Sequence, residues 1–232
     1  MELFIQGFIK ALQMLVSGDP EIYQITFTTL RVSLTAILIS TIVGIPLGVL
    51  LGLNTFRGKK IILVFVNIGM GLPPVVAGLY LTMLLWRSGP LGHLGFLYTT
   101  QAIIMAQVIV SLPIIIGLTS AAFQQIDSKM LMQLKALGAT GSQRLVLLLR
   151  ETKLAIFAAI MAGLGRVLAE VGAAMMVGGN VKGETRILTT SMVMEVSKGN
   201  FDVAIALSFI LMTLAFIITF ILTSLQQRKT HI

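Results

Sequence analysis

Five long apolar segments most constrain what this chain can fold into. A helix needs about 20 apolar residues to cross the hydrocarbon core of a bilayer, and five segments reach that length: residues 26–53, 61–86, 99–123, 154–177 and 201–225. Hydrophobic residues make up 56% of the chain and charged residues 11%, and the mean hydropathy is +0.96, which is outside the range of ordinary soluble domains. The sequence predicts one all-α integral membrane domain over residues 1–232, with a five-span bundle at 26–225.

The residues ahead of the first span form a shorter apolar stretch. Residues 3–16 are too few to cross a bilayer and include Gln6, Lys10 and Gln13. We expect an amphipathic helix that lies in the membrane interface within residues 1–20 and ends at the turn formed by residues 17–20.

The distribution of basic residues predicts the orientation of the bundle. Ten of them share one side with the C-terminus: Arg57, Lys59, Lys60, Lys129, Lys135, Arg144, Arg150, Lys153, Arg228 and Lys229. The other side holds five: Lys10, Arg87, Lys182, Arg186 and Lys198. By the positive-inside rule the C-terminus is cytoplasmic and the N-terminus lies outside. The net charge of +8 is thus a topology signal, and no nucleic-acid partner is expected.

The chain lacks the residues that several classes of function require. The chain has no cysteine and two separated histidines, and it contains no P-loop, no His-Glu-x-x-His or Gly-x-Ser-x-Gly motif, and no metal-ligand spacing. We therefore expect no catalytic residue, no metal site, no cofactor and no ATPase site in this chain.

Small residues recur at every fourth position of the first span. They are Ala36, Ser40, Gly44, Gly48 and Gly52. Such a stripe lies on one helix face and allows two helices to approach closely. The pattern predicts a helix–helix contact.

Two adjacent prolines interrupt the second apolar segment. Pro73 and Pro74 remove two amide donors and restrict the backbone of Leu72. The helix should break near the middle of the bilayer, either as a structural kink or as an element of a water-filled path.

The fourth apolar segment carries two charges. Arg166 and Glu170 are costly in lipid, and their i,i+4 spacing would place them on one helix face. We interpret them as a paired structural or gating element in preference to a direct substrate contact. The segment then ends at Gly178, Gly179 and Asn180, before a polar loop.

The cytoplasmic loop at residues 124–153 has the pattern of two short helices. Asp127 or Ser128 would cap the first, a turn follows at residues 138–141, and Ser142 would cap the second. An apolar face on the first helix is formed by Met130, Leu131, Leu134 and Leu137. This pair could lie on lipid or dock into a groove of a partner.

Five spans, an outside N-terminus and this cytoplasmic helix pair resemble the permease subunit of a small ABC importer of the molybdate, tungstate and methionine type. The segment 137–139 matches the glycine element of the family's coupling motif, whereas its Glu-Ala-Ala position falls on Met-Gln-Leu at 132–134. The resemblance implies a type I ABC importer permease fold. It also implies that a separate ATPase subunit is contacted by Met130, Leu131, Leu134, Leu137, Gly138 and Ala139.

Two further segments, 72–78 and 166–186, resemble the signatures of the oxyanion branch. The residues that the resemblance places in a translocation path or gate are Pro73, Pro74, Gly78, Arg166, Glu170, Gly172, Gly178, Gly179, Asn180, Thr185 and Arg186. The amino-acid sequence of these segments is most similar to that of tungstate permeases, and molybdate is the alternative cargo.

The resemblance implies residence in the cytoplasmic membrane of a prokaryote. The implied partners are the ATPase, an extracytoplasmic oxyanion-binding protein, a second copy of the chain and membrane lipid. An ion-coupled secondary transporter is less favoured, because no inverted repeat is apparent and Glu170 is the only acid in the interior of an apolar segment.

Overall fold

The computed structural model describes residues 2–227 of the chain. Arg228 and Lys229, counted above among the cytoplasmic basic residues, lie outside the described residues. Every regular element within residues 2–227 is helical, as predicted. The elements are α1 (Glu2–Val16), α2 (Pro20–Leu53), α3 (Lys59–Met70), α4 (Pro74–Leu85), the 3-10 helix η1 (Gly92–Leu94), α5 (Thr100–Gln124), α6 (Ser128–Ala136), α7 (Gly141–Glu151), α8 (Lys153–Leu168), α9 (Gly172–Gly178), α10 (Leu188–Ser197) and α11 (Phe201–Gln227).

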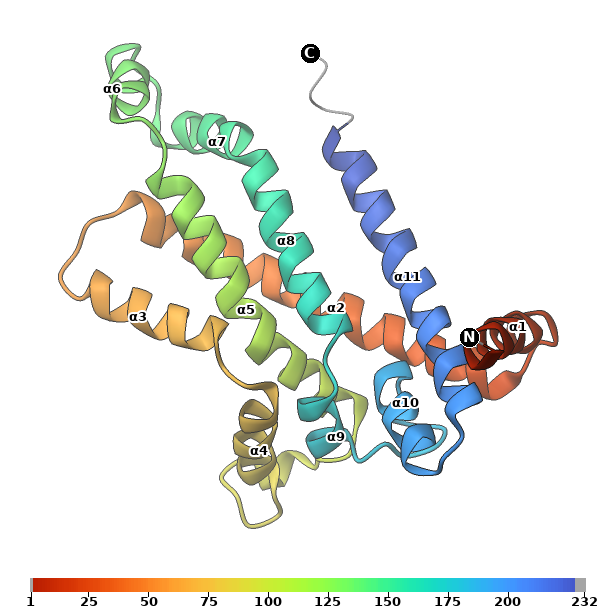
Figure 1. The fold of residues 1–232 in the computed structure, drawn as a ribbon. Helices are drawn as coiled ribbons and strands as arrows, with labels where there is room; N and C mark the ends of the chain where they lie inside the picture. The colour runs from red at the N-terminus through yellow and green to blue at the C-terminus, as the bar shows by residue number, and fades with distance from the viewer. Residues whose placement is uncertain (1, 228–232) are drawn as a thin grey trace.

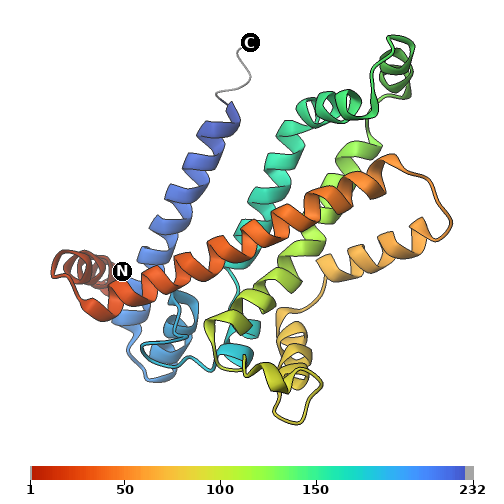
Figure 2. The ribbon, with the colours of Figure 1, turned by 180° about the vertical axis from the view of Figure 1, so that it is seen from behind.

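Three helices, α2, α5 and α11, are long and apolar enough to cross a bilayer alone. The pairs α3/α4 and α8/α9 reach that length together, and they are bent by 103° and 58° at their breaks. If each bent pair is one span, the five predicted apolar segments correspond to five spans. Helices α6 and α7 and the end of α11 gather at one end of the molecule, while α4, α9 and α10 lie at the other (Figures 1 and 2).

Helices α2 and α5 form the main helix–helix contact. Ser40 Oγ and Ser111 Oγ lie 2.7 Å apart. Further along α2 from Ser40, a Cβ added at Gly48 would lie 2.6 Å from Thr119 Cβ and 2.9 Å from the Ile116 carbonyl oxygen. The predicted contact through the small-residue stripe is therefore confirmed, because only a glycine lets the two backbones come this close.

The N-terminal helix α1 packs against the first turns of α11. The rings of Phe8 and Phe209 meet edge to face, 5.4 Å between centroids, and Lys10 pairs with Asp202. The turn at residues 17–20 ends α1 as expected, and Asp19 caps α2 by accepting a hydrogen bond from the Glu21 amide at 2.9 Å.

The helix pair predicted at residues 124–153 is present, with one correction. Asp127 caps α6 as predicted, accepting from the Lys129 amide at 2.8 Å. Helix α7 begins two residues earlier than expected, because Thr140 rather than Ser142 is its N-cap. Thr140 and Gln143 form a reciprocal capping box, in which Gln143 Oε1 accepts from the Thr140 amide at 2.8 Å.

The contact between α2 and α5 makes a prediction for Gly48→Ala. The added methyl group overpacks this contact, so we expect a loss of about 1–3 kcal/mol in the free energy of unfolding. The matched control is Gly165→Ala in α8, where no atom lies within 4 Å of the added Cβ. Thermal unfolding in detergent should show Gly48→Ala melting below the native chain and the control melting no lower, since alanine favours helix. Equal melting of both variants would contradict the close contact.

Candidate functional site

The two interrupted spans meet at their breaks. Pro73 is the residue before α4 and Pro74 is its first residue. On the other span, a Cβ added at Gly172 would lie 2.4 Å from Val75 Cγ2, and a Cβ at Gly78 would lie 2.6 Å from Ala173 Cα. Helices α4 and α9 therefore pack directly on each other, and four of the predicted path residues come together here.

Arg166 joins the two breaks. It is half-buried in the last turn of α8 and donates a hydrogen bond from Nη2 to the Leu72 carbonyl oxygen at 3.1 Å. That carbonyl precedes Pro73, so it lies in the break and outside both helices. The Arg166 Nε atom is buried and has no hydrogen-bond partner among the described residues. The guanidinium therefore keeps donor capacity beside the break.

The predicted pairing of Arg166 with Glu170 is wrong as a direct ion pair. No salt bridge joins these two described residues, and Glu170 lies beyond the end of α8 at Leu168, so the expected i,i+4 helical spacing does not apply. Glu170 is 2% exposed. Its Oε1 accepts from the Ala173 amide at 2.6 Å, and its carbonyl oxygen accepts from Thr189 Oγ1 at 2.9 Å. Glu170 thus orients α9 across the break.

Residues 178–185 form a closed turn at the outer end of α9. Gly179 and Asn180 both have positive φ angles, 67° and 52°. Thr185 Oγ1 donates to the Gly178 carbonyl at 2.5 Å and accepts from the Val181 amide at 2.9 Å. Asn180 Oδ1 accepts from Thr190 Oγ1 at 2.9 Å. These side chains are engaged in holding the turn, so the structure gives them a supporting position.

Arg186 lies in the same loop, but its charge is already paired. Its Nη1 is 2.8 Å from Glu21 Oε1, while Lys182 Nζ is 2.6 Å from Glu21 Oε2. Gln24 Nε2 also donates to the Gly183 carbonyl at 2.6 Å. The start of α2 therefore holds this loop in place. Nothing in the local sequence indicates this role of Glu21, because its partners lie about 160 residues further along the chain.

A second acid at this end is held by its neighbours. Glu195 accepts from Lys198 Nζ at 2.8 Å and from Asn200 Nδ2 at 2.7 Å. The Lys198 ammonium, together with Asn200, holds the pKa of the Glu195 carboxyl below its ordinary value. Glu21 and Glu195 at this end of the bundle are therefore both paired with cations of the same chain.

Arg31 is a cation that the sequence analysis overlooked. It lies within α2 and is exposed, on the helix face that also carries Gln24, Thr28 and Thr35. A basic residue inside an apolar segment indicates a functional position, and this sequence feature applies to Arg31 as it does to Arg166.

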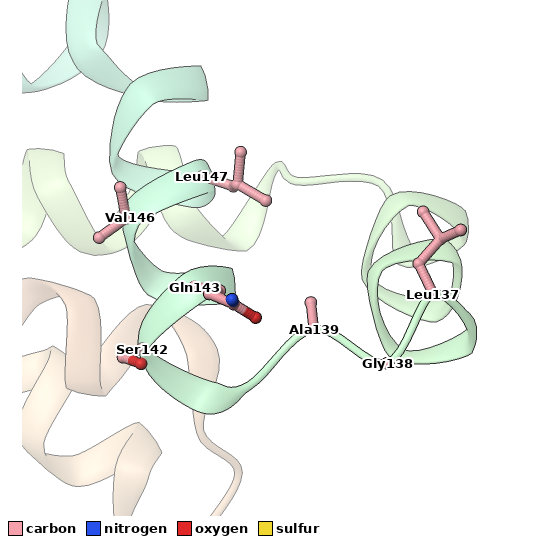
Figure 3. A pocket seen from close by; sticks show the side chains of 7 residues that line it. All are labelled: Leu137, Gly138, Ala139, Ser142, Gln143, Val146 and Leu147. Atoms are coloured by element: carbon pink, nitrogen blue, oxygen red, sulfur yellow. The ribbon is translucent and has the colours of Figure 1, made fainter.

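The α6/α7 helix pair borders an open groove of about 710 Å³ between the end of α6 and the exposed face of α7. Figure 3 shows Leu137 projecting from the α6 side, with Val146 and Leu147 on α7. Gly138, with a φ angle of 72°, and Ala139 form the connection between them. Leu137 is 82% exposed, which is high for a leucine that is not in a lipid-facing helix.

The apolar face of α6 that was predicted to meet a partner is mostly occupied. Met130, Leu131 and Leu134 pack on the cluster formed by Val49, Phe123 and Leu148 of the same chain. These three side chains are partly buried, so the bundle itself uses part of their apolar area, and their contact with an ATPase stays a prediction. The accessible apolar surface of the pair is that of Leu137 and α7.

Comparison with known proteins agrees with this architecture. The family model described as "Binding-protein-dependent transport system inner membrane component" matches residues 44–231. The chain belongs to this family. The tungstate uptake system permease protein TupB of Peptoclostridium acidaminophilum is 40% identical over 98% of this chain and 100% of the relative. TupB of Campylobacter jejuni is 34% identical over 98% of this chain and 95% of its own length.

A solved structure of the MetNI methionine ABC transporter, in inward-facing conformations, shares the fold. The TM-score is 0.71 at 18% identity, and the match covers 91% of this chain and 97% of the other. The predicted fold class, a type I ABC importer permease, is therefore confirmed. Family membership also confirms the predicted membrane location.

The position of Glu170 predicts how its substitutions behave. In Glu170→Ala the buried Ala173 amide loses its acceptor, which costs about 1–3 kcal/mol of unfolding free energy. Glu170→Gln keeps an oxygen at the same place, so we expect most of the stability to remain. Thermal unfolding in detergent distinguishes the two variants. An equal loss for both would show that the negative charge, and not the acceptor, is what stabilises the break.

Proposed function

We propose that this chain is the permease subunit of an ATP-driven ABC importer that carries tungstate into the cytoplasm. Two relatives named for tungstate uptake match almost the whole chain at 40% and 34% identity. ModB of Escherichia coli K12, named for molybdenum transport, is 29% identical over 77% of this chain. Molybdate is the alternative cargo, because it is also a tetrahedral dianion of similar size and a path would treat the two alike.

The observation that carries the proposal is the meeting of two broken spans with Arg166 between them. A break frees backbone groups that lipid cannot satisfy, and such breaks persist where they line a cavity or are buried in protein. Arg166 supplies a positive charge at this place, with an unpaired Nε–H and one donor on the Leu72 carbonyl. A passing dianion would accept hydrogen bonds from this guanidinium.

With Glu170 engaged by the Ala173 amide, Arg166 is free of the direct ion pair expected from the sequence. We therefore assign Arg166 a contact with the substrate at the gate in place of a structural ion pair with Glu170. Gly78 and Gly172 act with it by letting α4 and α9 pack closely, while Gly178, Gly179, Asn180, Thr185 and Arg186 shape the outer end of the path. Selection of the anion rests with the extracytoplasmic binding protein, because a path needs only weak binding for release.

The complete importer in this proposal contains two copies of the chain, a separate ATPase and the binding protein. A path along α4 and α9 needs a wall on the side that faces away from the bundle, and a symmetric second copy would supply it. The C-terminus and the α6/α7 end face the cytoplasm, because most basic residues of the loops gather there.

Transport by the reconstituted system tests the proposal. Vesicles that hold the permease, its ATPase and its binding protein should take up tungstate only when ATP is on the ATPase side. Arg166→Gln should lower uptake at least tenfold, since a charge-assisted hydrogen bond to the dianion is lost. Lys198→Gln, which removes an outer cation that pairs with Glu195, is the matched control. Uptake driven by an ion gradient without ATP would overturn the proposal.

The groove at α6 and α7 makes a prediction for ATPase docking. Leu137→Asp places a charge at the most exposed apolar side chain of the groove, so we expect co-purification with the ATPase to fall at least tenfold. Met132→Asp is the control, because Met132 is 61% exposed on the same helix but does not line the groove. Gly138→Asp is a weaker test, since the φ angle of 72° adds backbone strain. Equal loss in both leucine and methionine variants would contradict a docking site in the groove.

A further inference from the structure

The connection between α2 and α3 concentrates positive charge. Residues 54–60 contain Arg57, Lys59 and Lys60 and no acid. Lys59 Nζ donates to the Asn54 carbonyl at 3.0 Å. Arg57 and Lys60 make no side-chain hydrogen bond or ion pair with any residue that the structure describes. The positive potential of this corner is therefore not neutralised by the chain itself.

Helix α3 diverges from the bundle at its start. Its second half is packed on α5, where a Cβ at Gly69 would lie 2.8 Å from Pro113 Cγ, and a Cβ at Gly117 would lie 2.6 Å from Met70 Sδ. Its first half leaves α5, as Figures 1 and 2 show. None of the residues of α3, all of which are described, is buried. Ile61 and Phe65 are 62% and 68% exposed.

A cavity of about 620 Å³ opens where these features meet. It lies between the α2–α3 connection, the start of α3 and the last residue of α5. Lys59, Lys60 and Gln124 line it together with the apolar side chains of Phe56 and Ile61. The lining is thus positively charged at the lysines and apolar at Phe56 and Ile61, and exposed apolar side chains continue along α3.

We propose that this corner binds an anionic phospholipid. The headgroup phosphate lies against Lys60, Arg57 and the remaining donors of Lys59, and the acyl chains lie along Ile61 and Phe65 on α3. Basic pockets beside membrane helices bind anionic headgroups in this way, and each cation contributes about a fivefold gain in affinity.

The lining favours a lipid over the other occupants. A free tetrahedral dianion has no apolar part, so it would leave Phe56 and Ile61 unused. A second copy would have to bring acids to the same end of the bundle. Of the two acids at that end, Asp127 already caps α6 through the Lys129 amide, and Glu151 belongs to the last turn of α7. Charge and apolar surface together match a phospholipid.

The test compares lipids of equal acyl chains on the full chain purified in mild detergent. Native mass spectrometry should show phosphatidylglycerol retained and phosphatidylcholine lost. Arg57→Gln/Lys60→Gln leaves the Lys59–Asn54 hydrogen bond in place, and it should lower phosphatidylglycerol retention roughly tenfold or more. The control Lys129→Gln/Lys135→Gln removes the same charge from α6 at the same end and should retain the lipid as the native chain does.

Three results would overturn the proposal. Equal retention of both lipids by the native chain would show that charge does not select the occupant. An equal loss in the α6 control would show a general charge effect with no site at this corner. A rise in melting temperature with millimolar inorganic phosphate as large as that with phosphatidylglycerol would show an anion site that needs no acyl chains.

Discussion

Backbone hydrogen bonding at two helix breaks is the constraint on which the centre of this molecule depends. In a bilayer no water is available to satisfy backbone groups that a break sets free. Two charged side chains satisfy backbone groups at the breaks: Arg166 donates to the Leu72 carbonyl, and Glu170 accepts from the Ala173 amide. Each charged side chain is therefore engaged at a break, and no salt bridge joins these two described residues.

The breaks are held together by a scaffold of close helix contacts. The α2–α5 contact through Gly48 and the α4–α9 contact through Gly78 both rely on the missing Cβ. At the end of the bundle that holds α9 and α10, Glu21 ties the start of α2 to the loop after α9 through Lys182 and Arg186. A movement of α9 would therefore displace groups both at the break and at the start of α2, which is consistent with the proposed gating role.

Charge at the two ends of the bundle serves different purposes. At the end with α9 and α10, Glu21 and Glu195 each have cationic partners within the chain. At the end with α6 and α7, Arg57 and Lys60 have no such partner among residues 2–227. Unpaired positive charge of this kind both favours the cytoplasmic side of the membrane and attracts anionic lipid headgroups.

Local periodicity in the sequence was enough to predict the five spans, the glycine contact of α2, the break at Pro73 and the Asp127 cap, since each depends on residues within one helix. Only the tertiary structure decided what Arg166, Glu170 and Arg186 contact, and that Met130, Leu131 and Leu134 pack inward. The physical reason is distance along the chain. Leu72 is 94 residues from Arg166 and Glu21 is 165 from Arg186, so only folding could bring these partners together.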